Sequence, residues 1–332
     1  MKKPFLRRRL FLFITVCGNS AIDVKKNCYH WCCNYSQHRY MKQLAYLIGL
    51  LALTIPASCQ SPYVVSDHTA ENLFTSGIEG PAFDKKGNLY VVNFEKEGTI
   101  GLVKPDGKAE LFLNLPEGST ANSIKFDSKG DMYLADYTGH NVLKVDMKTK
   151  DVTAYVHDER FNQPNDIIFN KKDQIFASDP NWKAGTGQLW RIDAGGKAVL
   201  LTNDMGTTNG IALSPDERTL YVNESVQRKI WAFDVDDAAG ISNKRLFAEF
   251  PDFGFDGMAC DNKGNLYVTR YGKGVIAILS PDGKVQREVP LKGKRCSNLV
   301  FGGRNGKTVY VTMQDRKGVE KFQAEFPGKG LK

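Results

Sequence analysis

Residues 79–93 read EGPAFDKKGNLYVVN, and five similar stretches follow them along the chain. Each copy contains a polar residue, a short apolar strand, a turn, and a second strand rich in β-branched or aromatic residues. The later copies read NSIKFDSKGDMYLAD, NDIIFNKKDQIFASD, NGIALSPDERTLYVN, DGMACDNKGNLYVTR and SNLVFGGRNGKTVYVT. The fifth residues of the six copies recur every 41 to 47 positions, at Phe83, Phe126, Phe169, Leu213, Cys260 and Phe301.

This repeat predicts an all-β protein. Each copy continues with two further strand-like stretches, such as residues 99–103 and 110–114 after the first copy. Units of about 40–45 residues with four short strands each are typical of β-propeller blades. A β-sandwich or two smaller β-domains would need a linker, and none separates the copies. We predict a six-bladed β-propeller of four-stranded antiparallel blades over residues 61–332, with blades that start near residues 79, 122, 165, 209, 256 and 297.

The ring also needs a closing strand, because the sixth copy ends one strand short, after GVEKFQAEF at residues 318–326. The segment AENLFTS at residues 70–76 resembles AELFLNL at residues 109–115, which is the expected outer strand of the first blade. We therefore predict that residues 70–76 complete the last blade, join the two ends of the ring and protect its edges.

The N-terminal 60 residues have a different character. Residues 41–60 place one Lys ahead of an apolar run and small residues, a pattern typical of a secretion signal. We expect a periplasmic or extracellular protein, cut either after Cys59 or before it, in which case a lipid on Cys59 would provide the only membrane contact. Residues 1–40 are expected to lie upstream of the true start, Met41, and outside the mature protein. Their crowded cysteines and histidines do not fit a standard zinc finger: Cys28, His30, Cys32, Cys33 and His38.

The net charge of +8 also belongs to this leader. Nine of the 45 Lys and Arg residues lie within residues 1–60, where only Asp23 is acidic, so the rest of the chain is neutral overall. A neutral body gives no support for nucleic acid as a partner, and a small molecule is expected instead. Cys260 and Cys296 are the only cysteines after the leader. The protein is therefore not a disulfide scaffold, and we expect a monomer.

Equivalent positions at the start of each blade predict a metal site. The first strand of every blade lines the central channel, so the residues four positions before the fifth-residue landmarks form a ring at one mouth. All six carry an oxygen donor: Glu79, Asn122, Asn165, Asn209, Asp256 and Ser297. Two carboxylates among amide oxygens predict a hard divalent cation, Ca²⁺ in preference to Mg²⁺, Mn²⁺ or Zn²⁺. The alternative is a water-filled channel in which these turn-forming residues are structural and the acids are partly protonated.

Four of these stretches resemble the gluconolactonase and senescence marker protein family of six-bladed propellers. They are Glu79-Gly80-Pro81 and residues 163–180, 209–225 and 256–274. The resemblance implies that Glu79, Asn165, Asn209 and Asp256 bind the metal, and that Asn122 and Ser297 line the pocket.

The same resemblance bears on the substrate. Animal-type sugar lactonases of the family carry an Arg where this chain has Gln163, so their sugar specificity does not transfer directly. Residues 177–193 look like the equivalent segment of bacterial gluconolactonases, which makes Trp182 a pocket wall. Arg270 and Tyr271 follow the second strand of the fifth copy and can reach the same pocket.

The expected function is a metal-dependent hydrolase, most simply a lactonase. A bound Ca²⁺ would act as Lewis acid, Asp256 would act as general base, and Glu79 would mainly hold the metal. Direct attack by Asp256 on the substrate stays open. A phosphotriesterase-like hydrolase and a non-catalytic ligand-binding propeller are the alternatives. The chain contains no G-x-S-x-G, H-E-x-x-H or P-loop motif that would indicate other chemistry.

Overall fold

The computed structural model describes residues 62–331. The predicted extension at residues 1–40, with its cysteine and histidine cluster, and the predicted signal at residues 41–60 lie outside this range. The described chain forms 24 β-strands. It contains no helix long and apolar enough to cross a membrane.

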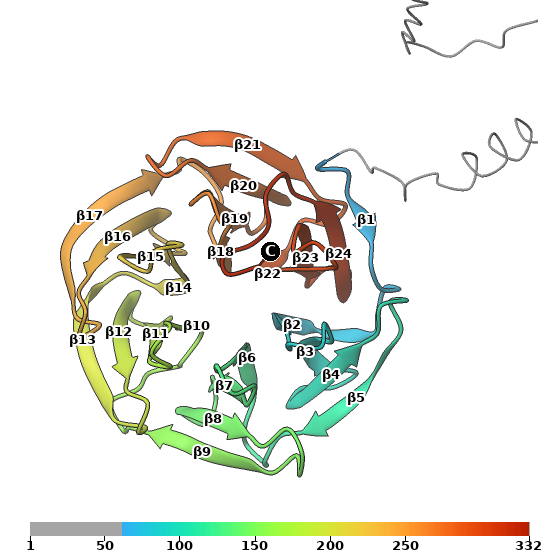
Figure 1. Cartoon of the computed structure of the whole chain (residues 1–332), viewed down its shortest axis with the longest axis horizontal. Helices are drawn as coiled ribbons and strands as arrows, with labels where there is room; N and C mark the ends of the chain where they lie inside the picture. The colour runs from blue at the N-terminus through green and yellow to red at the C-terminus, as the bar shows by residue number, and fades with distance from the viewer. Residues whose placement is uncertain (1–61, 332) are drawn as a thin grey trace, which may run out of the picture. The chain divides into compact units, whose positions relative to one another are not determined.

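These strands form six four-stranded antiparallel sheets around a central axis (Figure 1). The first blade contains β2 (Phe74–Phe83), β3 (Leu89–Phe94), β4 (Thr99–Val103) and β5 (Ala109–Asn114). The second contains β6 (Ala121–Phe126), β7 (Met132–Asp136), β8 (Asn141–Val145) and β9 (Val152–His157). The third contains β10 (Ile167–Phe169), β11 (Ile175–Asn181), β12 (Thr186–Ile192) and β13 (Ala198–Met205).

The remaining three blades repeat this order. The fourth contains β14 (Thr208–Leu213), β15 (Thr219–Glu224), β16 (Lys229–Val235) and β17 (Ile241–Glu249). The fifth contains β18 (Met258–Cys260), β19 (Leu266–Arg270), β20 (Val275–Leu279) and β21 (Val285–Pro290). The sixth contains β22 (Cys296–Gly302), β23 (Thr308–Met313), β24 (Gly318–Gln323) and β1 (Ser66–Asp67). The predicted six-bladed propeller is confirmed, with the first strand of each copy innermost (Figure 1).

An N-terminal strand closes the ring, but it lies earlier in the chain than predicted. β1 pairs with β24, with Ser66 opposite Lys321. Residues 74–76, which were predicted to be the closing strand, instead begin the innermost strand of the first blade. The reason is burial, because the ring of Phe74 packs edge-on against Phe94 inside that blade, at 5.5 Å between centroids.

Aromatic pairs connect neighbouring blades and explain the repeated landmark residues. A tyrosine on the second strand of one blade packs against a phenylalanine at the end of the next blade's innermost strand. Four interfaces contain this pair, with centroids 4.9 to 5.5 Å apart: Tyr90–Phe126, Tyr133–Phe169, Tyr267–Phe301 and Tyr310–Phe83. The last pair crosses the junction between the sixth and first blades, so the ring closes with the same packing that builds it.

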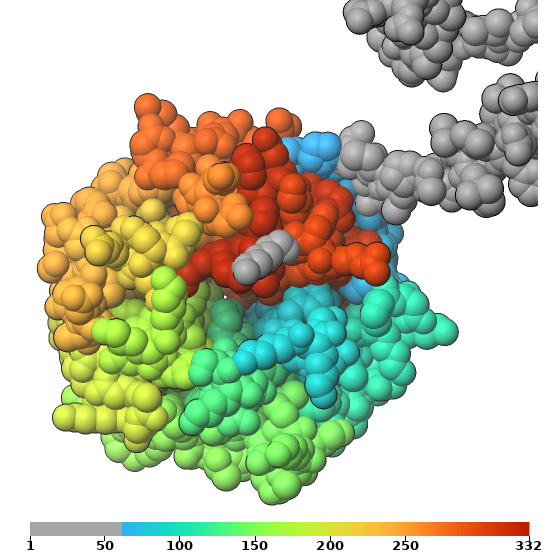
Figure 2. Space-filling view, viewed as in Figure 1, coloured from blue at the N-terminus to red at the C-terminus, as the bar shows by residue number. Residues whose placement is uncertain are grey.

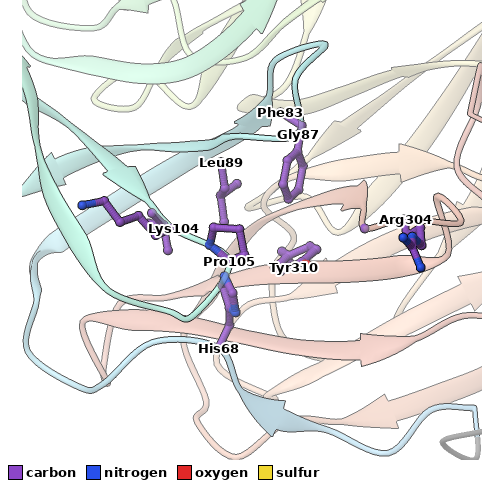
Figure 3. Close-up of a pocket in the computed structure, with 10 residues that line it drawn as sticks. His68, Phe83, Gly87, Leu89, Lys104, Pro105, Arg304 and Tyr310 are labelled. Atoms are coloured by element: carbon purple, nitrogen blue, oxygen red, sulfur yellow. The ribbon is translucent and has the colours of Figure 1, made fainter. Parts of the chain in front are cut away.

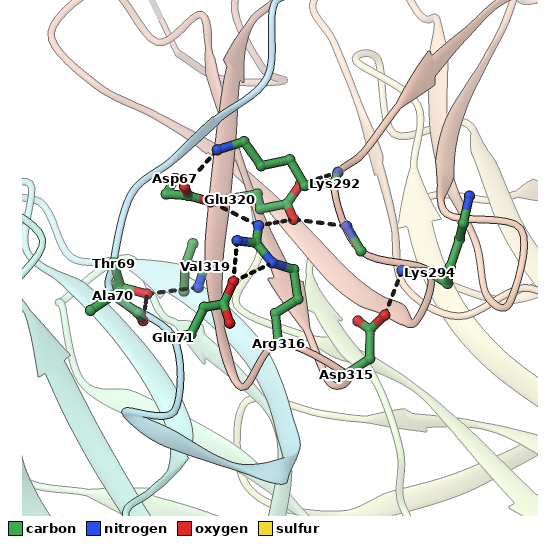
Figure 4. Close-up of polar contacts among 11 residues, drawn as sticks. Asp67, Thr69, Ala70, Glu71, Lys292, Lys294, Asp315, Arg316, Val319 and Glu320 are labelled. Carbon is green, nitrogen blue, oxygen red and sulfur yellow. Dashed lines mark hydrogen bonds and ion pairs between the residues drawn. The ribbon is translucent and has the colours of Figure 1, made fainter.

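An ionic network fastens β1 to the last blade (Figure 4). The Arg316 guanidinium lies 2.7 Å from Asp67 Oδ1 and 2.6 Å from Glu320 Oε1, and it also pairs with Glu71. Lys292 reaches the other oxygen of Asp67 at 2.5 Å. Since the Glu320 side chain is only 2% exposed, its charge depends on Arg316 for compensation.

A cavity of about 280 Å³ lies beside this closure, between the first and last blades (Figure 3). His68, which follows β1, packs edge-on against Tyr310 there, with ring centroids 4.9 Å apart. Burial lowers the pKa of His68 to about 4, so its ring is neutral at pH 7.

The C-terminal segment covers one mouth of the channel. The backbone of Lys329 donates to the carbonyl of Cys260 at 2.9 Å, and Asn262 donates to the carbonyl of Pro327 at 2.8 Å. Figure 2 shows this face, with the C-terminal residues in red over the centre of the ring. The innermost strands end at this mouth, so their starting residues lie at the other one. Cys260 and Cys296 are buried and free.

Candidate metal and substrate site

The starts of the innermost strands enclose a cavity of about 370 Å³ at the uncovered mouth. Five of the six ring residues predicted from the sequence line it, as does Trp182. Residues from all six blades or their connections form the wall: Glu79, Asn122, Tyr137, Asn165, Trp182, Asn209, Ser225, Phe255, Asp256, Tyr271 and Gln314.

The sixth ring residue, Ser297, does not line this cavity. Its side chain is fully buried, and its hydroxyl donates to the carbonyl of Ile78 at 2.8 Å. Ser297 thus links the last blade to the first. Gln163 is also absent from the cavity wall. Its backbone N–H donates to Asp179 Oδ1 at 2.6 Å.

Irregular strand starts direct the ring residues into the channel. The pairing of β2 with β3 shifts register on both sides of Glu79, and that of β14 with β15 shifts between Thr208 and Ile211, around Asn209. Such bulges re-aim side chains and are common beside functional sites. Asn165 and Asp256 lie just before their strands begin.

Two glycines next to these residues are required by close backbone packing. A Cβ on Gly80, whose φ is +50°, would lie 2.7 Å from the Cα of Ser123. A Cβ on Gly210 would lie 2.2 Å from the carbonyl oxygen of Asp256. The pairs Glu79-Gly80 and Asn209-Gly210 therefore reflect crowding around the channel as well as turn formation.

The two acids at the site face each other. Burial raises the pKa of Glu79 to about 7 and is also the largest cause of the strongly raised pKa of Asp256. The negative charge of Glu79 raises the pKa of Asp256 further. Two carboxyl groups in such contact share protons in the absence of a cation, and a dication between them would favour their ionised forms.

A third acid, Asp166, is buried beside the ring residue Asn165 and was missed from the sequence. Its carboxylate accepts a hydrogen bond from Ser123 Oγ at 2.7 Å and lies 3.5 Å from Lys125 Nζ. Its charge adds to the raised pKa of both Glu79 and Asp256. Asp166 directly follows Asn165 in the chain, one position after the register that identified the ring residues.

The side-chain amides of Asn165 and Asn209 can provide oxygen ligands for a cation. Asn165 Oδ1 is buried and has no hydrogen-bond partner among the described residues. An unpartnered buried amide oxygen is costly unless a ligand completes it. Asn209 hydrogen-bonds to Asp256 and lowers the pKa of that carboxyl, partly opposing burial. Two carboxylates and two amides with hard oxygen donors therefore fit a divalent cation of the calcium type.

Four aromatic residues also line the cavity: Tyr137, Trp182, Phe255 and Tyr271. Tyr137 follows β7 directly, and Phe255 precedes Asp256. The Tyr271 hydroxyl donates to Gln314 Oε1 at 2.9 Å, which fixes the orientation of that amide. Tyr137, Ser225, Phe255 and Gln314 were not identified from the sequence, since each lies outside the repeated motif.

Arg270 does not line the cavity, contrary to the sequence expectation. Its side chain is fully buried, and its guanidinium lies 3.9 Å from the centroid of the Phe250 ring. Its Nη2 donates to the backbone oxygen and to Oδ1 of Asp252, at 2.5 and 2.7 Å. Aromatic stacking therefore draws Arg270 away from the cavity, into the base of the loop that carries Phe255 and Asp256.

Fold and site together define a class of protein: six-bladed β-propellers with a polar ligand site built from the starts of the innermost strands at one channel mouth. The chain belongs to the SMP-30/Gluconolactonase/LRE-like family, whose sequence pattern matches residues 78–315. This match confirms the family resemblance found in the motifs.

Known relatives include a lactonase and a fluorophosphatase by name. The chain is 27% identical to the gluconolactonase of Zymomonas mobilis, over 70% of this chain and 75% of that protein. It is also 27% identical to the diisopropyl-fluorophosphatase of Loligo vulgaris, over 78% of this chain and 94% of that protein. The solved structure of a calcium-binding regucalcin from Agrobacterium tumefaciens has the same fold, with a TM-score of 0.67 and 22% identity over 80% of this chain and 93% of that one.

Proposed function

We propose that this protein is a calcium-dependent lactonase. The observation that carries the proposal is that Glu79, Asn165, Asn209 and Asp256, from four different blades, line one cavity. Similarity to the Zymomonas mobilis gluconolactonase supports the lactonase class, and the calcium-binding relative of the same fold supports the choice of ion.

The donor atoms favour calcium over softer metals. Zinc usually needs several His, Cys, Asp or Glu side chains close together. Within residues 62–331, no three such side chains form a group that could hold a metal. Calcium accepts carboxylate and amide oxygens in irregular geometry, whereas magnesium keeps more of its water. Mg²⁺ and Mn²⁺ share these ligand types and are the cations to compare with it.

The residues of the site divide the work of hydrolysis. When bound, the cation would polarise the lactone carbonyl and oppose the negative charge that develops on its oxygen. Asp256, which is only half-buried, would accept a proton from water as the water oxygen bonds to the carbonyl carbon, and would return that proton to the ring oxygen as the ring C–O bond breaks. Glu79 is 3% exposed, so it is better suited to hold the metal than to exchange protons with solvent. Asn165 and Asn209 would orient the ion and the substrate.

A phosphotriesterase-like hydrolase is the second candidate. The squid relative, named for cleavage of a fluorophosphate, matches over 94% of its length, and the same ring of residues would serve that chemistry. Both reactions place negative charge on an oxygen beside the cation, so the donor set alone does not select between them.

Metal depletion tests the enzymatic proposal. The mature protein is treated with a calcium chelator and assayed on uncharged lactones and on a fluorophosphate, before and after Ca²⁺ is restored. We expect lactone hydrolysis to disappear and then return with calcium. Hydrolysis that persists after elemental analysis finds no bound metal would contradict metal dependence. Calcium binding without turnover of either substrate class would instead indicate a non-catalytic binding propeller.

Export remains part of the proposal. The secretion pattern at residues 41–60 supports a periplasmic or extracellular protein, either soluble or lipidated at Cys59. Mass spectrometry of the mature N-terminus distinguishes these forms, and a mature protein that begins at Met1 would contradict export through this signal. We also propose a monomer, which light scattering tests.

A further inference from the structure

Three large apolar side chains are exposed on connections that contribute to the cavity wall. Trp182 lies on the turn between β11 and β12, Val226 on the turn between β15 and β16, and Phe253 on the loop between β17 and β18. They are 38%, 58% and 46% exposed, respectively. We call these three residues the apolar rim. Single exposed apolar residues are common, but a connected apolar surface beside a cavity indicates a ligand contact.

Hydrogen bonds join the three connections into one surface. Gln227 Nε2 donates to the carbonyl of Gly185 at 3.1 Å, which ties the turn of Val226 to that of Trp182. The Ser225 hydroxyl donates to the carbonyl of Phe255, which ties the same turn to the loop of Phe253.

Each connection also contributes to the cavity wall, through Trp182, Ser225 and Phe255. The rim is therefore continuous with the cavity.

The backbone at Phe253 supports a specific role for its ring. Phe253 has a φ of +47°, a conformation that a bulky residue rarely adopts. Its ring lies against the turn of Tyr271 and Gly272, close to the position that a Cβ on Gly272 would occupy. An aromatic ring held at the surface by a strained backbone marks a candidate contact site.

The electrostatics of the cavity favour an uncharged substrate over an anionic one. No Lys, Arg or His is among the described residues that line it. A dication would be balanced by the two carboxylates of Glu79 and Asp256, which leaves no net positive charge for a phosphate, sulfonate or carboxylate on the substrate. Asp252, on the same loop as Phe253, is already paired with Arg270 at 2.7 Å.

We infer that the substrate is an uncharged lactone with an apolar substituent, an alkyl or aryl group that lies on the apolar rim while the lactone ring enters the cavity. This inference rests on the proposed lactonase activity. It adds the substrate class, which the family match does not specify.

A chain-length series tests the inference. The calcium-loaded protein is assayed on γ-butyrolactone, on γ-lactones with n-alkyl chains of increasing length, and on the polyhydroxylated D-glucono-δ-lactone. Burial of each methylene on the rim should raise kcat/KM about two- to fourfold until the rim is covered. The gain should appear mainly as a lower KM, since the chain lies away from the reacting atoms.

Rim variants provide the matched comparison. Phe253→Ser and Val226→Ser should flatten the chain-length dependence, measured as the ratio of kcat/KM for a long-chain lactone to that for γ-butyrolactone. Leu246→Ser and Val285→Ser are the controls. Both residues are 49% exposed and lie on the outermost strands β17 and β21, so these variants should keep the wild-type ratio.

The outcomes separate this inference from the proposed function. A wild-type ratio near one, a preference for glucono-δ-lactone over every alkyl lactone, or equal ratios in rim and control variants would overturn the inference while lactonase activity stands. If none of the lactones is hydrolysed, the proposed function itself fails.

Discussion

Glu79 and Asp256 lie together in a buried site. Burial makes one ionised carboxylate there unfavourable, and repulsion makes two ionised carboxylates more unfavourable still. In the metal-free protein both carboxyl groups therefore have a raised pKa and stay protonated to a higher pH than usual. A divalent cation offers the other solution, which releases those protons on binding.

The stability of the metal-free protein should therefore depend on pH in an unusual direction. Glu79 has an ordinary pKa of 4.5 and a folded-state pKa of about 7, so the folded protein holds a proton that the unfolded chain has released between these values. Stability should then fall by about 2–3 kcal/mol as pH rises from about 4.5 to 7. Thermal melts in chelator measure this fall, which saturating Ca²⁺ should remove.

The control is Glu79→Gln, a variant that carries no titrating group at this position. Its melting temperature in chelator should change less over the same pH range. A wild-type melting temperature that rises steadily from pH 5 to 7 in chelator would contradict the account of Glu79.

Asp256→Asn tests the assignment of the base. An amide can still coordinate the ion but cannot accept a proton from water, so kcat at saturating Ca²⁺ should fall by about 10²–10⁴-fold. Circular dichroism should show an unchanged fold. Asp237→Asn, at an exposed position on the hairpin that follows β16, is the matched control. Wild-type turnover by Asp256→Asn would remove Asp256 from this role.

Sequence reasoning found the residues of the repeat and missed those outside it. Glu79, Asn165, Asn209 and Asp256 occupy equivalent positions in their blades, so one register identifies them all. Ser297 occupies the same register, but its hydroxyl is bonded to the first blade instead. Gln314 and Tyr137 each begin the four-residue connection that follows the second strand of their blade, just beyond the stretch in which the six copies were compared.

At the scale of elements, the loop between β17 and β18 depends on a residue outside the cavity. Arg270 stacks on Phe250 and binds both the backbone and the side chain of Asp252. Arg270 Nε and Nη1 have no hydrogen-bond partner among the described residues. Aromatic packing, the contact with Asp252 and an ion pair with Glu288 at 3.6 Å therefore compensate this buried cation, and we expect it to position Asp256 indirectly.

Arg270→Met should keep much of the packing volume but release this loop. We expect calcium affinity to weaken by about tenfold, because a misplaced ligand loses part of its interaction. Isothermal titration calorimetry measures the change. Arg245→Met, which removes an exposed Arg paired with Asp234, is the control and should bind calcium as the wild type does. Unchanged calcium affinity in a folded Arg270→Met variant would show that the loop keeps its conformation without the Arg270 contacts.

The closing strand illustrates where sequence similarity misled. Residues 70–76 look like an outer strand, but their apolar residue Phe74 is buried in the first blade. β1 is only two residues long, which is too short for an alternating pattern that would predict a strand. Its attachment depends on the Arg316 network, which joins residues far apart in the sequence.

Arg316→Met should destabilise the protein by about 1–3 kcal/mol, because it leaves the buried Glu320 carboxylate without its cation. Urea unfolding measures the change in free energy. The exposed pair of Lys284 and Asp282 offers a contrast, and Lys284→Met should leave the free energy of unfolding almost unchanged. Equal stability of the Arg316 and Lys284 variants would show that the closure does not depend on this network.

At the scale of the whole molecule, repetition made the fold predictable. Six copies with nearly constant spacing carry the same strand and turn signals. A strand that is hard to recognise in one copy can therefore be assigned from the equivalent position in the others. The tyrosine-to-phenylalanine pairs give the repeat its physical basis, since each blade packs against the next in the same way. The ring arrangement then brings together oxygen donors that lie up to 177 residues apart, from Glu79 to Asp256.

Metal stoichiometry tests the central claim most directly. Purified protein equilibrated with Ca²⁺ and freed of unbound ions is analysed for bound metal, alongside a Glu79→Gln/Asp256→Asn double variant. The account predicts one tightly bound divalent ion per wild-type chain and none in the folded double variant. A wild-type protein that binds no cation under saturating Ca²⁺, or a double variant that binds as tightly as wild type, would contradict it.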